Sequence, residues 1–171
     1  MRTRRAGGNN KGYTLVEIMV VVAILAVALT YTGMSIALVV TTNVRKCANN
    51  MNALISQARV NTMYKVEPSV TFRVSGGSII GDYYEGGTRK ESKEMGSAGI
   101  SVTVEYDGGS FTLTDGGTPV NIAFTRGTGA LKEGGSPRSY TKCTAIRLTR
   151  GNSAYSIIIS PATGKHEIEL G

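Results

Sequence analysis

The sequence predicts an α+β fold, in which a long N-terminal helix packs by its second half on a C-terminal antiparallel β-sheet domain. Two observations predict the helix. Ile18–Val40 contains no charged residue, and apolar residues then recur at three- and four-residue spacing as far as residue 63. A third observation predicts the sheet. After Pro68 the sequence consists of short apolar or alternating runs, separated by Gly pairs and Asp-Gly steps.

Composition fits one β-rich domain plus a membrane segment. The chain has 171 residues, of which 22 are Gly and only 18% are charged, which favours a turn-rich β region over a helical bundle. The net charge is +7, but four of the positive charges precede Tyr13, and the remaining residues carry +3. The basic charge therefore belongs largely to the leader and does not indicate a nucleic-acid-binding surface.

The N-terminal third of the sequence divides into a leader and a helix. Residues 1–12 are basic and rich in Gly and Asn, which is typical of a targeting leader that is removed. Residues 13–40 are expected to form a transmembrane helix, because Ile18–Val40 would span about 30 Å of hydrocarbon at 1.5 Å per residue. The basic leader predicts that the N-terminus stays in the cytoplasm and that the chain crosses the inner or cytoplasmic membrane once.

Residues 41–66 are expected to continue the same helix with an amphipathic pattern, to about Lys65. Pro68 ends the pattern. The apolar stripe needs a covering surface, which the sheet domain can supply. Its members are Val44, Cys47, Ala48, Met51, Leu54, Ile55, Ala58 and Met63.

Residues 67–171 are expected to form the extracytoplasmic β-rich domain. The predicted strands are Ser69–Val74, Ile79–Tyr84, Ile100–Tyr106, Ser110–Thr114, Val120–Phe124, Thr144–Thr149, Tyr155–Ser160 and Lys165–Leu170. The charged, Gly-rich segment Glu85–Gly99 and a segment at about Lys132–Lys142 are expected to be exposed loops.

The sequence offers little material for catalysis. Its one histidine, His166, is expected to be an exposed strand residue, and we find no nucleophile–base pair and no phosphate-binding loop motif. We therefore expect no catalytic residue, no metal site and no cofactor. Cys47 and Cys143 either pair as a disulfide or remain as buried free thiols, because their spacing matches no motif.

Glu17 is the strongest functional candidate, because it is the only charged residue between Lys11 and Arg45. A carboxylate in a membrane helix costs about 2.5–3.5 kcal/mol at the centre and less near the interface, so such residues are functional candidates with a partner to be found.

The run Gly12-Tyr13-Thr14-Leu15-Val16-Glu17, followed by an apolar helix, resembles the N-terminus of type IV pilins and type II secretion pseudopilins. The resemblance implies that prepilin peptidase cuts after Gly12 and that the new N-terminal residue, Tyr13, is N-methylated. Tyr13 stands where Phe is commoner. Glu17 would be the fifth mature residue and would pair with the amine of Tyr13, often in a neighbouring subunit, which fixes the assembly register.

The same resemblance implies partners and a location. The partners are other pilin subunits, an assembly ATPase and a platform protein, and the product is an extracellular or periplasmic filament. Three C-terminal segments, Val120–Gly127, Tyr155–Ser160 and Thr163-Gly164-Lys165, resemble the GspH/FimT type of minor pilin, with Lys165 in place of Arg.

Several alternatives remain open. The chain could be a major pilin, a secretion pseudopilin or a competence pilin, or a plain membrane-anchored or secreted β-domain with a signal-peptide cut after Ala28. A competence pilin could bind DNA directly through tyrosines and basic residues, although these alternate with acids. The residues concerned are Tyr83, Tyr84, Tyr106, Tyr140, Tyr155, Arg89, Lys90, Lys142 and Arg147.

Overall fold

The computed structural model describes residues 12–97, 99–132 and 143–171, without the side chains of residues 30–40. The chain divides into two compact units, Met1–Leu38 and Val39–Gly171. Helix α1 (Leu15–Asn61) begins in the first unit and ends in the second. Within the described residues, no helix offers an apolar stretch long enough to cross a membrane. The transmembrane segment expected over residues 13–40 therefore stays a prediction.

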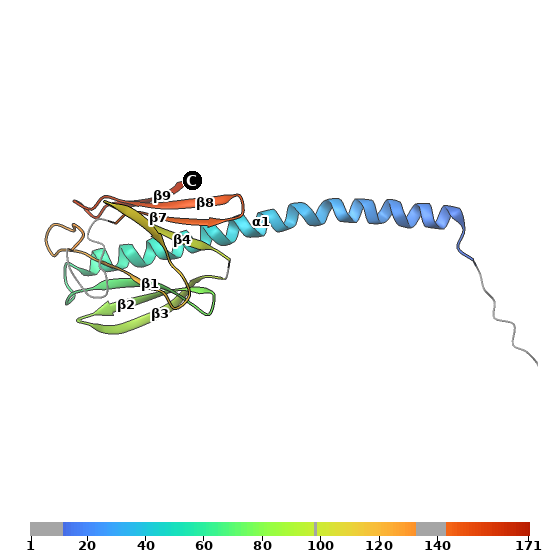
Figure 1. The fold of residues 1–171 in the computed structure, drawn as a ribbon. Coiled ribbons are helices and arrows are strands. Elements are labelled where there is room, and N and C mark those ends of the chain that lie inside the picture. Colours follow the sequence, from blue (N-terminus) through green and yellow to red (C-terminus); the bar gives the residue numbers. More distant parts are fainter. Residues whose placement is uncertain (1–11, 98, 133–142) are drawn as a thin grey trace, which may run out of the picture. The chain divides into compact units, whose positions relative to one another are not determined.

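Among the residues that the structure describes, nine strands follow the helix, which confirms the α+β class (Figure 1). They are β1 (Ser69–Ser75), β2 (Ser78–Glu85), β3 (Thr88–Gly96), β4 (Ser101–Tyr106), β5 (Gly109–Thr112), β6 (Val120–Ala123), β7 (Cys143–Arg150), β8 (Ser153–Ile159) and β9 (His166–Leu170). All neighbouring strands pair antiparallel.

The strands form two antiparallel sheets, a division that the sequence analysis did not specify. Sheet A has the order β3-β2-β1-β6, and sheet B has the order β5-β4-β7-β8-β9. The chain passes from sheet B to sheet A after β5, through a segment that contains Asp115. The carboxylate of Asp115 accepts hydrogen bonds from the N–H groups of Gly76 and Gly77 at 3.1 and 3.2 Å, which attaches this connection to the β1–β2 turn.

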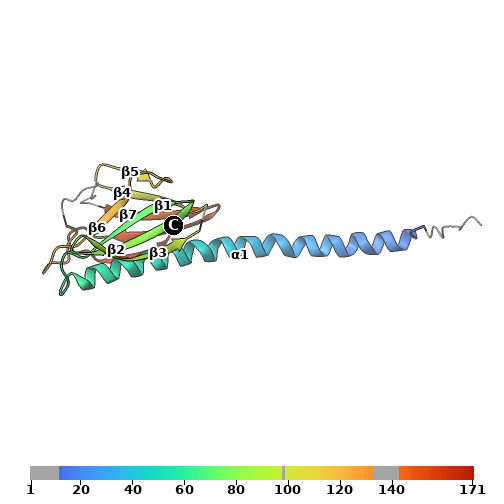
Figure 2. The ribbon, with the colours of Figure 1, turned by 90° about the horizontal axis from the view of Figure 1, so that it is seen from below.

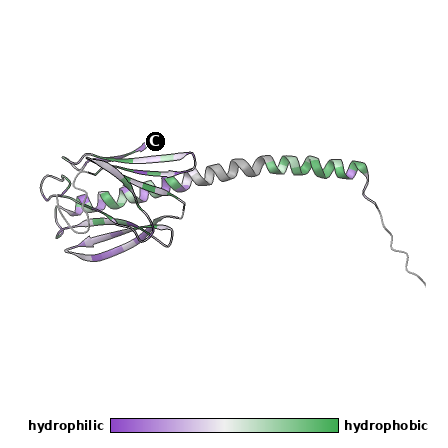
Figure 3. Ribbon diagram, viewed as in Figure 1, coloured by the Kyte–Doolittle hydropathy of each residue, from purple (hydrophilic) through white to green (hydrophobic). Residues whose placement is uncertain are grey.

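All eight predicted strands are present, but β3 was missed. The segment expected to be a loop, Glu85–Gly99, contains this strand, which is exposed along most of its length and polar (Figure 3). Gly86 and Gly87 have φ of 55° and 76°, which permits a tight two-residue hairpin from β2. Charged side chains on an edge strand disfavour pairing with another chain along that edge. The second expected loop lies largely outside the described residues, at 133–142.

The second half of α1 contributes its apolar stripe to the core, as the sequence predicts. The stripe residues from Val44 to Ala58 are at most 5% exposed. Met63 is the exception at 75%, because the helix already ends at Asn61.

Sheet A approaches the helix closely at a glycine. A Cβ added to Gly81 would lie 2.8 Å from Leu54 Cδ2. Sheet B meets the helix through polar contacts, since Ser56 Oγ lies 2.7 Å from His166 Nε2. Figure 2 shows both sheets on the same side of this part of the helix.

One carboxylate, that of Asp82 in β2, is buried within sheet A. Arg73 Nε donates to its Oδ2 at 2.9 Å, and Arg89 lies 3.8 Å from its Oδ1. Burial by itself would raise the pKa of Asp82, but hydrogen bonds from Ser92 and Arg73, with the positive charges of Arg73 and Arg89, hold that pKa below its usual value. Asp82 therefore stabilises the fold in its ionised form.

Candidate processing and assembly site

The Gly12–Glu17 segment forms the entry into helix α1. Gly12 and Tyr13 precede the helix in non-helical conformation, and Tyr13 is 78% exposed. No heavy atom beyond its chain neighbours would lie within 4 Å of a Cβ added to Gly12. The Gly12–Tyr13 peptide bond is therefore free of regular structure and open to an enzyme.

Thr14 caps the helix. Its Oγ1 accepts a hydrogen bond from the Glu17 N–H at 3.2 Å, and its carbonyl accepts from the Ile18 N–H at 3.2 Å. Thr14-x-x-Glu17 matches the Ser/Thr-x-x-Glu pattern of a capping box, a signal present in the sequence that we did not use in predicting the helix start. Glu17 also lies in the first turn, where the helix dipole favours a negative charge by about 0.3–1 kcal/mol.

The Glu17 side chain is exposed. Within the described part of the chain, its carboxylate makes no hydrogen bond or ion pair. The capping interaction uses only the backbone of Glu17, so the carboxylate remains available for a partner outside the chain.

The helix around Glu17 presents apolar side chains on every side. The large apolar residues between Leu15 and Leu29 are 48–76% exposed (Figure 3). A contiguous apolar surface of this kind marks an interaction site with protein or lipid. Glu17 therefore lies at the start of a surface that another molecule must cover.

Cys47 and Cys143 are buried free thiols and do not form a disulfide in the structure. Cys47 lies on α1 against Gly96, and the Cys143 thiol donates to the Ala145 carbonyl at 3.8 Å. Burial raises the pKa of both thiols to about 12. At neutral pH both are therefore protonated, which makes them poor nucleophiles and poor metal ligands.

His166 is a strand residue, as expected, because it begins β9, but the expectation that it is exposed was wrong. Its ring is partly buried, with Nδ1 at 2.9 Å from the Gly164 carbonyl and Nε2 at 2.7 Å from Ser56 Oγ of α1. It links β9 to the helix across 110 positions of sequence, and no local pattern could have indicated this contact. No group of three or more His, Cys, Asp and Glu side chains within the described residues is arranged to hold a metal ion.

Among the described residues, the tyrosines and basic residues considered for DNA binding are divided between the two sheets. Tyr83 is buried and bonded to the Asn61 side chain at 2.6 Å. Arg89 is in sheet A beside Asp82, whereas Arg147 is in sheet B and bonded to Glu105 at 3.2 Å. Two further members, Tyr140 and Lys142, lie outside the described residues.

Two of the three C-terminal segments that the sequence analysis compared with minor pilins, those containing Phe124 and Gly164, meet in space. A Cβ added to Gly164 would lie 2.9 Å from Phe124 Cε1 and 2.0 Å from the Gly129 carbonyl oxygen. Gly164 has a φ of +64°, so both its conformation and the close approach require glycine. Arg59 of α1 donates to the Thr163 carbonyl at 2.9 Å and fixes this turn to the helix.

Comparison with known proteins supports the N-terminal interpretation. The family model described as "Prokaryotic N-terminal methylation motif" matches residues 7–32, which include Gly12, Tyr13 and Glu17. No curated protein and no solved structure matches the chain significantly. With its exposed Gly12–Tyr13 junction, its capped apolar helix and this matched motif, the chain carries the N-terminal signature of type IV pilins and pseudopilins.

Proposed function

We propose that the chain is a non-catalytic structural subunit of a type IV pilus-like filament, of the minor pilin or pseudopilin kind. The observation that carries this proposal is the methylation motif at residues 7–32, with Glu17 as the lone charge in an apolar helix. The signature implies processing by prepilin peptidase and assembly with other pilins.

Processing takes place between Gly12 and Tyr13. A protease binds its substrate as an extended segment, and this junction lies before the first helical residue, Leu15. Glycine at position 12 lets the chain fit closely into the protease groove. The cut creates the amine of Tyr13, and methylation of that amine leaves its positive charge in place.

Before assembly, Ile18–Val40 anchors the chain in the inner or cytoplasmic membrane with the leader in the cytoplasm. This stretch contains no charge, and the basic residues of the leader precede it. An assembly ATPase and a platform protein then transfer the subunit from the membrane to the filament. The apolar side chains of α1 exchange contact with lipid for contact with neighbouring helices.

Glu17 fixes the register of assembly. In the filament its carboxylate meets the Tyr13 amine of a neighbouring subunit, so both charges are paired within an apolar environment. Any other register leaves two buried charges without partners, and removing one partner of a buried pair costs about 3–5 kcal/mol. The carboxylate of Glu17 is exposed and has no partner within the described residues, which supports this role.

The C-terminal resemblance supports a minor rather than a major subunit. Phe124 and Gly164, from two of the three segments similar to the GspH/FimT type, pack together in the second unit.

Substitution at Glu17 separates processing from assembly. We expect Glu17→Ala to be cut normally and to fail in filament assembly, whereas Glu17→Asp, which keeps the charge, retains part of the assembly. Gly12→Leu should remain uncut in the membrane. Immunoblots of the precursor and mature forms, with electron microscopy of sheared filaments, measure both steps. Normal filaments from Glu17→Ala would refute the register role.

A further inference from the structure

Ser56 and His166 form a hydrogen-bonded pair of a hydroxyl and an imidazole. Ser56 lies in α1 and His166 begins β9, and Ser56 Oγ is 2.7 Å from His166 Nε2. Both residues belong to the second unit, and both are half-buried, so solvent reaches part of the pair. Because 110 positions separate them, no local sequence pattern indicates this combination of a nucleophile and a base.

The second ring nitrogen fixes the tautomer of His166. Nδ1 lies 2.9 Å from the Gly164 carbonyl oxygen, which can only accept a hydrogen bond, so Nδ1 carries the proton. In the neutral ring Nε2 then has a free lone pair, and the Ser56 hydroxyl donates to it. A hydroxyl, a base in contact with it and a third group that orients the base are the arrangement that activates serine nucleophiles. Here the third group is a neutral carbonyl, which stabilises an imidazolium less than a carboxylate would.

The helix surface around Ser56 offers contacts to an apolar acyl group. Ala53 and Val60 lie one turn before and one turn after Ser56 on the same side of α1, and both are exposed, Val60 by 57%. Arg59, three residues after Ser56, donates from Nη2 to the Thr163 carbonyl at 2.9 Å. A guanidinium has further N–H donors, which can face the negative charge that develops on an attacked carbonyl.

The position of Ser56 inside a helix disfavours rapid release of an acyl group. Oxyanion holes commonly use backbone N–H groups close to the nucleophile. In α1 the N–H of Ser56 is already bonded to the carbonyl of Asn52, one turn earlier, so it cannot serve in this way. The reaction is therefore restricted to activated esters, and its product persists. Such a single attachment is compatible with a structural subunit that does not turn over a substrate.

We propose that Ser56 is a covalent attachment site for an apolar acyl group, supplied by an activated ester such as a thioester, with His166 as the general base. Ser56 Oγ attacks the carbonyl carbon of the thioester, and its proton passes to His166 Nε2. The carbon–sulfur bond then breaks, and the proton passes from Nε2 to the departing thiolate. An ester of Ser56 and a free thiol remain. The site depends neither on leader removal nor on filament assembly.

Labelling of the full-length chain in detergent with an alkyl fluorophosphonate tests the nucleophile. The probe reacts by the same step, since the serine oxygen bonds to phosphorus and fluoride leaves. Ser153 is the matched control, because it is also half-buried and its hydroxyl lies 2.7 Å from Thr41 Oγ1 instead of an imidazole. Peptide mass spectrometry should show at least about tenfold more label on Ser56 than on Ser153, since a general base contributes about 10²–10⁴-fold. Equal labelling would overturn the proposal.

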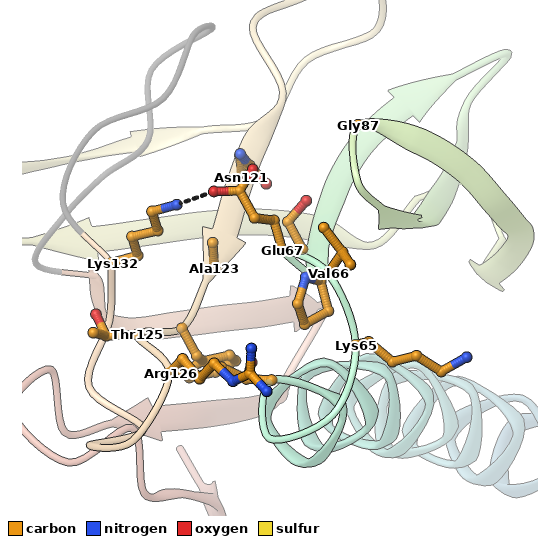
Figure 4. Close-up of a pocket in the computed structure, with 13 residues that line it drawn as sticks. Lys65, Val66, Glu67, Gly87, Asn121, Ala123, Thr125, Arg126 and Lys132 are labelled. Atoms are coloured by element: carbon orange, nitrogen blue, oxygen red, sulfur yellow. Dashed lines mark hydrogen bonds and ion pairs between the residues drawn. The ribbon is translucent and has the colours of Figure 1, made fainter.

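A cavity elsewhere in the second unit controls for simple capture of an apolar probe. It has a volume of about 490 Å³, lies just beyond the end of α1, and is lined by hydroxyl side chains that include Thr62, Ser69 and Thr125 (Figure 4). None of these hydroxyls has an imidazole beside it, because the one histidine of the chain, His166, is bonded to Ser56. Label on the cavity residues in place of Ser56 would show capture without activation and would also overturn the proposal.

The variant His166→Gln separates basicity from packing. Glutamine keeps a hydrogen-bonding group but is no base, so labelling of Ser56 should fall at least about tenfold, and Ser56→Ala should lose the label at this position. Circular dichroism verifies folding, and the comparison of Ser56 with Ser153 in the wild-type chain needs no variant. Unchanged labelling in a folded His166→Gln protein would refute the role of His166.

The acyl preference is tested with p-nitrophenyl esters. The octanoate should leave an octanoyl ester on Ser56 faster than the acetate leaves an acetyl ester, because the longer chain contacts Ala53 and Val60. Equal rates would contradict the apolar class of the acyl group. Leader cleavage and filament assembly of Ser56→Ala are measured alongside and should match the wild type, so failure of the acylation is distinguishable from failure of the proposed function.

Discussion

Gly164 holds the turn between β8 and β9 against the rest of the second unit, and its replacement by alanine is expected to destabilise the fold strongly. Gly164 N–H donates to the Ser160 carbonyl at 2.7 Å, and its φ is +64°. An added Cβ would lie 2.0 Å from the Gly129 carbonyl oxygen and 2.9 Å from the Phe124 ring. Neither backbone nor a packed ring can move away without disturbing its neighbours.

The expected loss of folding free energy in Gly164→Ala is the sum of a conformational cost and a steric cost. A left-handed conformation costs an L-residue about 1–2 kcal/mol, and inserting an extra group into a packed site costs about 1–3 kcal/mol. Gly164→Ala should therefore lower the free energy of unfolding by about 2–5 kcal/mol. Gly151 is the matched control, because it has a φ of +57° but no heavy atom within 4 Å of an added Cβ. Gly151→Ala should show the conformational cost alone.

Thermal unfolding followed by far-UV circular dichroism measures both variants in the full-length chain. For a chain of this size, each kcal/mol corresponds to about 2–4 °C in Tm. The Gly164→Ala variant should therefore lose several degrees more than Gly151→Ala. Equal losses from the two variants would show that the close approach to Gly129 and Phe124 is not present in solution.

Four further predictions concern buried and capping groups. Both native thiols should react with iodoacetamide at pH 8 much more slowly than in the unfolded chain, and a disulfide between Cys47 and Cys143 found by mass spectrometry would contradict this. Because burial raises their pKa from 9.0 to about 12, stability should fall as pH rises across that range. The pKa of Asp82 is lowered in the folded state, so its contribution to stability is present above about pH 4 and is lost as the pH falls through the lowered pKa. Asp82→Asn should therefore destabilise the protein at pH 7, and the difference from wild type should shrink progressively below about pH 4, as measured by urea unfolding. Thr14→Ala should weaken the first turn of α1 by about 0.5–2 kcal/mol, with Thr14→Ser close to wild type, as measured by amide exchange.

Local signals explain which parts of the fold could be predicted. Gly pairs and Asp-Gly steps separated the alternating runs, and all eight strands predicted from them are present. The apolar stripe on α1 was visible because its period matches a helix with one buried face. The N-terminal motif is equally local, because residues 7–32 are enough to recognise it.

The missed features depend on context that the sequence does not display locally. β3 has charged side chains along an exposed edge, so neither of its faces produces an apolar alternation. The division into two sheets depends on a connection attached by Asp115 to a distant turn. His166 appeared exposed because its partner, Ser56, is far away in the sequence. Met63 continued the helical pattern after the helix itself had ended.

The mass and N-terminus of the mature chain test the central claim most directly. The chain is expressed with prepilin peptidase, and the product is analysed by intact mass spectrometry and N-terminal sequencing. The account predicts a chain of residues 13–171 that begins at Tyr13 and carries one additional methyl group, and an uncut precursor when the peptidase is absent. A mature chain that begins at Met1, or one cut after Ala28 without methylation, would contradict it.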